Sequence, residues 1–75
     1  MQLKFETYHE GKFWCARACG VDIFTQGRTK DELIQNISEA VKLHFEDTRL
    51  SPENTECRWS GDVITVNMVF QNHSG

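Results

Sequence analysis

The sequence predicts an α+β fold: a single antiparallel sheet in the order β-β-β-α-β, with one amphipathic helix packed on one face. Two patterns carry this prediction. Residues 2–26 form short alternating or apolar runs separated by glycine-containing breaks, and residues 30–48 repeat their apolar positions with the period of a helix. The chain has 75 residues, of which 39% are hydrophobic and 25% charged, so we expect one globular domain spanning 1–75.

Three strands are expected before the helix. Residues 2–7 alternate between long polar side chains and Leu, Phe or Thr, the pattern of a half-buried strand. The polar break at 9–12 contains a glycine and predicts a hairpin turn into a second strand at 13–17. Gly20 marks the next turn, and a third strand is expected at 21–26.

The helix is expected over residues 30–48. Thr29 is a favourable N-cap, and Glu32 three residues later completes the T-x-x-E pattern of a capping box. The apolar positions fall within an arc of about 140° on a helix with 3.6 residues per turn. These positions are Leu33, Ile34, Ile37, Ala40, Val41 and Phe45. Pro52 cannot continue a helix, so the helix is expected to end before it.

A polar loop is expected at 52–56, and residues 58–59 either extend it or begin a short strand. A turn at 60–62 leads into the clearest strand of the chain, 63–70, and residues 71–75 form a polar tail. One face of this last strand is expected to pack on the helix. It carries Ile64, Val66, Met68 and Phe70.

The charge balance bears on the class of partner. Eight basic and eleven acidic residues give a net charge of −3, which argues against a direct nucleic-acid binder and fits a basic partner. The N-terminus lacks a signal-peptide pattern, and no apolar run approaches the ~20 residues of a membrane-spanning helix. The three cysteines are an odd number, which indicates reduced thiols. We therefore expect a cytoplasmic protein without membrane contact.

The residues that bear reactive groups do not form a recognisable catalytic or metal motif. His9, Cys15, Cys19 and Cys57 lack the C-x₂-C spacing of a zinc site. A cysteine nucleophile needs a histidine within reach, and nothing near Cys15 supplies one, so its thiol is expected to pack as a small hydrophobe.

The acidic residues at strands or strand ends are the remaining candidates for chemistry. Glu6, Asp22 and Asp62 belong to no acidic motif that would hold Mg²⁺. We therefore expect a protein that is not an enzyme, with no catalytic residues, no metal and no cofactor.

Residues 13–46 resemble the HicB-like antitoxin family. The resemblance consists of short motifs in the family's order: Trp14-Cys15-Ala16, Gly20, Gly27-Arg28-Thr29, Asp31-Glu32-Leu33, Glu39-Ala40-Val41 and Leu43-His44-Phe45-Glu46. It implies a truncated ribonuclease-H-like fold and a protein that binds and neutralises a small basic HicA-like toxin ribonuclease, or acts as an orphan regulatory scaffold. The chain looks like the solo-domain branch of the family, without a DNA-binding module.

The helix exterior is the predicted partner-binding surface. It comprises Glu32, Glu39, Leu43, Glu46 and Asp47, because acidic side chains suit a basic partner and Leu43 lies about 130° from the apolar arc. His44 falls inside the arc. It is either a core or rim histidine bonded to a backbone carbonyl, or an interface histidine that titrates near neutral pH.

The face of the sheet away from the helix is the second predicted surface. Its apolar residues are Phe13, Cys15, Ile23 or Phe24, Val63 and Val69. An uncovered apolar face predicts self-association into a homodimer or larger assembly. An alternative function uses the same face differently, with the chain acting as a small ligand-binding or enzyme accessory domain.

Overall fold

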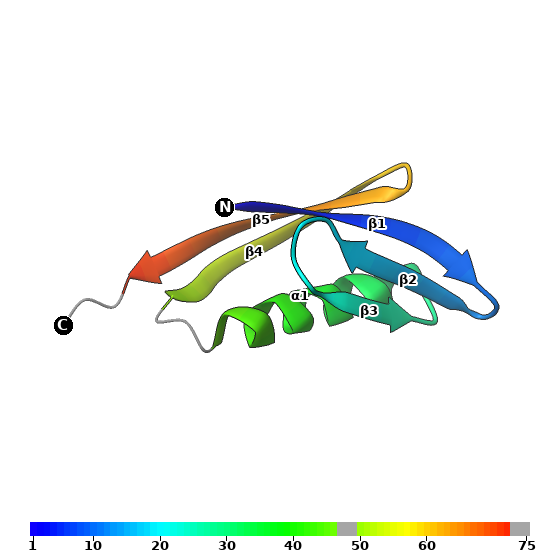
Figure 1. The fold of residues 1–75 in the computed structure, drawn as a ribbon, viewed down its shortest axis with the longest axis horizontal. Coiled ribbons are helices and arrows are strands. Elements are labelled where there is room, and N and C mark those ends of the chain that lie inside the picture. The colour runs from blue at the N-terminus through cyan, green and yellow to red at the C-terminus, as the bar shows by residue number, and fades with distance from the viewer. Residues whose placement is uncertain (47–49, 73–75) are drawn as a thin grey trace.

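The computed structural model describes residues 1–46 and 50–72, and it contains one helix under a curved five-stranded sheet (Figure 1). The elements are β1 (Gln2–Glu10), β2 (Phe13–Ala18), β3 (Phe24–Gly27), α1 (Lys30–Glu46), β4 (Leu50–Ser60) and β5 (Val63–Asn72). The sheet order is β3-β2-β1-β5-β4, and every neighbouring pair is antiparallel. The predicted α+β fold, one antiparallel sheet with one helix, is confirmed.

Two hairpins build most of the sheet. In β1–β2 the pair Glu10↔Phe13 closes a two-residue turn, and in β4–β5 the pair Ser60↔Val63 does the same. The first turn residue is a glycine with positive φ in both: Gly11 at 59° and Gly61 at 62°. A glycine with positive φ at the first turn position is typical of the type II′ turn, whose twist matches that of the flanking strands. Both turns lie where the sequence predicted a break.

The main difference from the prediction is a fifth strand. Residues 52–56, expected as a loop, lie within β4, which pairs with β5 along its whole length. Inward positions Thr55, Cys57 and Trp59 are half-buried, and the residues between them are exposed. A hydroxyl, a thiol and an indole make a weak apolar alternation, so the strand pattern was not evident in the sequence.

Pro52 is tolerated in this strand because β4 is at the edge of the sheet. The pairing register shifts between Pro52 and Asn54, which is a bulge of the kind found at sheet edges. The helix ends before Pro52, as expected, but the proline lies in a strand and not in a loop. Residues 47–48, the predicted last helical residues, lie outside the described part of the chain.

Two further boundaries differ from the prediction. The third strand begins at Phe24 and not at residue 21, because residues 21–23 form a bend in which the Ile23 N–H bonds to the Val21 carbonyl at 3.0 Å. The bend buries Ile23 and leaves Phe24 53% exposed. Residues 71–72, expected as tail, belong to β5, and 73–75 lie outside the described residues.

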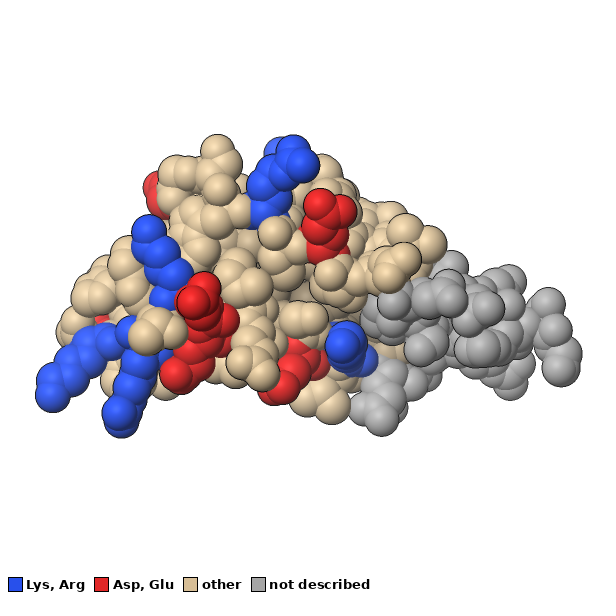
Figure 2. Space-filling model, turned by 180° about the vertical axis from the view of Figure 1, so that it is seen from behind, with Lys and Arg blue, Asp and Glu red and all other residues tan. Residues whose placement is uncertain are grey.

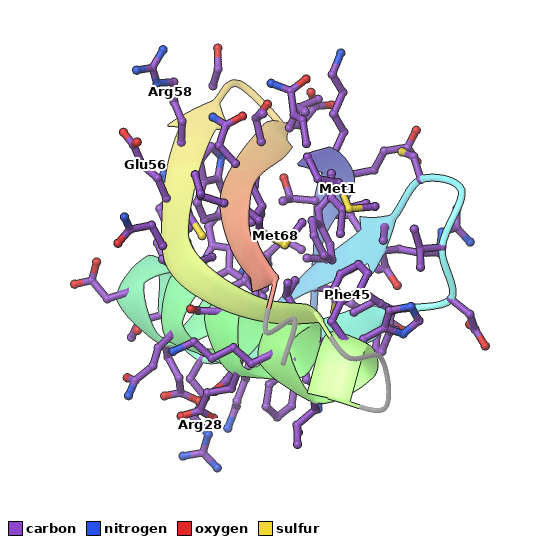
Figure 3. All side chains as sticks on the ribbon, turned by 90° about the vertical axis from the view of Figure 1, so that its left-hand side faces the viewer. Met1, Arg28, Phe45, Glu56, Arg58 and Met68 are labelled. Atoms are coloured by element: carbon purple, nitrogen blue, oxygen red, sulfur yellow. The ribbon has the colours of Figure 1, made fainter. Side chains whose placement is uncertain are left out.

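The core fills the space between the concave face of the sheet and α1 (Figure 3). Leu33, Ile37 and Val41 of α1 are fully buried, as the apolar arc predicted. The strands supply Leu3, Phe5, Ala16, Ala18, Ile64, Val66 and Met68. The predicted inner face of the last strand is therefore confirmed at 64, 66 and 68, while the side chain of Phe70 is not among those described.

The first turn of α1 lies directly on the backbone of β3. A Cβ atom added to Gly27 would lie 2.6 Å from the backbone nitrogen of Leu33 and 3.0 Å from its Cα. Non-bonded heavy atoms pack at about 3.5–4.0 Å, so no side chain fits at residue 27. The close approach brings Leu33 into the core at the very start of the helix.

Ile37→Ala is expected to destabilise the fold by about 2–5 kcal/mol, because it leaves a cavity in the middle of the core. Gln35→Ala, at an exposed position of the same helix, is the control and should change stability by less than about 0.5 kcal/mol. Urea unfolding measures both. Equal midpoints would show that the buried side of α1 is assigned wrongly.

Gly27→Ala is expected to destabilise the fold by about 1–3 kcal/mol, because the added methyl group overpacks the contact between β3 and α1. The neighbouring change Gln26→Ala keeps the backbone and removes only an exposed side chain, so its unfolding midpoint should stay near that of the parent. A Gly27→Ala chain as stable as Gln26→Ala would contradict the close approach.

Candidate functional site

Three of the predicted partner-binding residues lie on one side of α1. Glu32, Glu39 and Leu43 lie within about 40° of one another around the helix axis, on the side away from the sheet. All three are exposed, and Leu43 is 67% exposed. We call these three residues the acidic helix face. The backbone of Glu46 continues the same side of the helix, its side chain is not described, and Asp47 lies outside the described residues.

The start of the helix holds Glu32 in place. The Thr29 hydroxyl accepts a hydrogen bond from the Glu32 N–H at 3.0 Å, which confirms the predicted N-cap. The returning bond of the capping box differs from expectation, because the Glu32 carboxylate accepts from the Arg28 N–H at 3.4 Å and not from Thr29. Glu32 therefore contributes to the helix start as well as to the acidic helix face.

Lys30 lies on the opposite side of α1, about 160° around the axis from Glu32. Its ammonium lies 5.3 Å from the ring centroid of Trp14 and 5.2 Å from that of Trp59. The two indoles meet edge to face at 5.7 Å, and His9 packs against Trp14 in the same way at 4.7 Å. The attraction of the rings opposes the unfavourable position of a cation at a helix N-terminus.

This Lys30–tryptophan contact was not predicted from the sequence. It joins residues from β2, α1 and β4, and β4 itself was not expected. Its consequence for the surface is electrostatic, because it directs the Lys30 charge away from the acidic helix face. Figure 2 shows several Lys and Arg side chains at one end of the molecule, others at its top and right of centre, and acidic side chains between them.

His44 is exposed, although its helical angle places it inside the apolar arc. Its ring meets the Phe45 ring edge to face at 5.0 Å and 88°. Helical periodicity predicts the direction in which a side chain points but not how deeply it is buried. His44 lies in the last turn of α1, and its side chain is exposed there. Its exposure contradicts the predicted core position, whereas a rim position and an interface role stay predictions.

The convex face of the sheet carries the second set of predicted residues. Tyr8, Phe24 and Val69 are 43%, 53% and 60% exposed, and Phe13 and Val63 are half-buried. No described element covers this face (Figure 3). Phe24 belongs to it and Ile23 does not. The Arg17–Glu6 pair on this face spans 3.9 Å between exposed groups and contributes little to stability.

The candidate metal ligands do not come together. Cys15 belongs to the convex side of the sheet, whereas the register places His9 and Cys57 on the concave side. Among the described residues, no three His, Cys, Asp or Glu side chains are grouped as a metal site requires. Glu6 lies beside Arg17, and Asp22 and Asp62 are exposed at turns. The described helix is too short and too polar to span a bilayer.

Comparisons with family models, with curated proteins and with solved structures find no match to this chain. Its function must therefore be inferred from its own surfaces.

The three thiols differ in accessibility, and all are free. Cys19 is exposed, Cys15 is buried, and burial raises the pKa of the half-buried Cys57 thiol. Because the thiolate is the nucleophile, a raised pKa lowers the reactive fraction at a given pH. We expect iodoacetamide at pH 8 to alkylate Cys19 first and Cys57 more slowly, with the Cys57 rate still rising as the pH increases further.

Peptide mass spectrometry of a timed reaction measures these rates, and the same reaction in denaturant is the control, where the three thiols should react alike. Native Cys57 reacting as fast as Cys19 would contradict the burial of Cys57.

Proposed function

We propose that this chain is a non-catalytic protein-binding module of the HicB-like antitoxin type, which binds a small basic HicA-like toxin ribonuclease in the cytoplasm. The observation that supports the proposal most directly is the acidic helix face, where Leu43 is 67% exposed one turn from the exposed Glu39, with the exposed Glu32 two turns further along the same side of α1. The free thiols support a reducing compartment.

The composition of this surface suits a small basic partner. A large exposed apolar side chain with the charged residues Glu39 and Lys42 next to it on the helix has the arrangement of an interface centre with a polar rim, in which the apolar group supplies much of the affinity. The negative charge of the carboxylates accelerates the encounter with a basic protein and disfavours the binding of acidic proteins. Holding Lys30 on the opposite side of α1 keeps its positive charge away from the partner.

A second candidate function is a ligand-binding or enzyme accessory domain that uses the convex face. The observation that favours it is the exposure of Tyr8, Phe24 and Val69 on a face that no described element covers. Aromatic side chains of this kind pack readily against planar ligands or another protein. An orphan regulatory scaffold would use either surface.

The binding test uses a small basic HicA-like ribonuclease, first that of the neighbouring reading frame. Leu43→Asp and Glu39→Lys are each expected to weaken binding at least about tenfold in calorimetry, because they remove the apolar centre and reverse a rim charge. Added salt should lower the association rate of the parent chain.

Phe24→Ser is the control on the convex face and should leave the affinity unchanged under this proposal. The reverse pattern, loss with Phe24→Ser and none with Leu43→Asp, would reject the acidic helix face as the binding surface. No binding to a HicA-like protein would reject the antitoxin assignment.

A further inference from the structure

The two edges of the sheet are not equivalent. β3 is short, and the carbonyl of Gln26 on its free edge accepts a hydrogen bond from the Asn36 side chain of α1 at 2.7 Å. A capped and short edge is poorly suited to pairing with another strand. At the other edge, β4 has 11 residues, and no described element lies beyond it (Figure 3).

The register of the β4–β5 hairpin fixes which backbone groups face this edge. Ser60↔Val63 closes a two-residue turn, so these two residues exchange both of their hydrogen bonds. Hydrogen-bonded pairs alternate along an antiparallel ladder, so between the bulge and the turn the even-numbered residues of β4, from Asn54 to Ser60, bond to β5. The N–H and C=O groups of Thr55, Cys57 and Trp59 therefore point to the free edge.

The charges on this edge are unpaired within the described part of the chain. Glu56 and Arg58 are both exposed and, being two residues apart, lie on the same face of β4. Their partners on β5 are Asn67 and Thr65, which are neutral. Figure 3 shows both side chains projecting from β4 away from the rest of the molecule. The strand thus presents one negative and one positive group, symmetric about Cys57.

We propose that β4 pairs antiparallel with β4 of a second copy of this chain, with the two-fold axis at Cys57. In this register Glu56 lies opposite Arg58 of the second copy, and Arg58 lies opposite its Glu56. Cys57 meets Cys57, and Thr55 meets Trp59, so the residues whose backbone groups face the edge form the hydrogen-bonded pairs. The two five-stranded sheets become one continuous sheet with both helices on the same face.

The charges select this register among those that the backbone allows. Sliding the second copy by two residues keeps the hydrogen-bond pattern, but it places Glu56 opposite Glu56 in one direction and Arg58 opposite Arg58 in the other. Like charges directly opposite each other destabilise a strand pair, whereas opposite charges stabilise it. The pairing uses the edge of the sheet, so the acidic helix face stays free and the two proposals are tested separately.

Charge reversal tests the pairing in the full chain. Sedimentation equilibrium is expected to give a dimer for the parent at micromolar concentration. Glu56→Arg and Arg58→Glu should each raise the dimer dissociation constant at least about tenfold, because each creates two like-charge contacts across the axis. The double variant Glu56→Arg/Arg58→Glu restores opposite charges and should return to within about threefold of the parent.

Lys4→Glu, an exposed charge change on the convex face, is the control and should leave the dimer unchanged. A monomeric parent overturns the proposal. A dimer that resists both reversals but dissociates with Phe24→Ser also overturns it and places the contact on the convex face. Circular dichroism confirms that each variant is folded.

Disulfide trapping tests the register itself. In the proposed register, residue 54 lies opposite residue 60 of the second copy. The two residues form a non-hydrogen-bonded pair, whose Cα atoms are about 4.5 Å apart and within disulfide range. The variants are made in a Cys19→Ser/Cys57→Ser background, which removes the accessible native thiols. An oxidised mixture of Asn54→Cys and Ser60→Cys chains should form a mixed disulfide. Either variant alone should stay uncrosslinked. A disulfide-linked homodimer of either variant alone, or the absence of a mixed disulfide in the mixture, overturns the register.

Discussion

The missing side chain at Gly27 is the constraint on which the arrangement of the molecule depends. One helix has to seal the concave side of a five-stranded sheet, and it does so only because its first turn rests on the backbone of β3. Leu33 enters the core there, and Ile37 and Val41 follow it at one-turn intervals. With that side fixed against the sheet, the helix has no freedom of rotation, and Glu39 and Leu43 must face outward.

The sequence predicted those parts of the fold that have strong periodicity. The helix and the strand at 63–70 have apolar faces that repeat at 3.6 and at two residues, and the glycines at 11 and 61 mark the turns. β4 lacks such a signal. Its inward residues are Thr55, Cys57 and Trp59, and an edge strand needs only modest burial, so only its pairing with β5 makes it a strand.

The same reasoning explains what was predicted of the candidate surfaces. The outward position of Leu43 and Glu39 follows from helical geometry alone, so the sequence suffices for it. The Lys30 contact with Trp14 and Trp59 joins positions 14, 30 and 59, which only the tertiary fold brings together. Phe24 lies on the convex face and Ile23 does not, because the chain bends at residues 21–23. The alternation of polar and apolar residues in the sequence does not predict this bend.

The pairing of β1 with β5 has a consequence for the order in which the protein forms. Gln2 of β1 pairs with Asn67 of β5, and Glu6 pairs with Val63. β1 is the middle strand of the sheet and is synthesised first of the five, whereas its neighbour β5 is synthesised last. During synthesis β1 can pair with β2 at once, but its other side stays without a partner until residues 63–67 have left the ribosome. For that interval the nascent chain exposes a strand edge and the apolar side of Leu3 and Phe5, the features that chaperones bind and that promote aggregation. The rate of translation through the helix and β4 thus sets how long this most vulnerable state lasts.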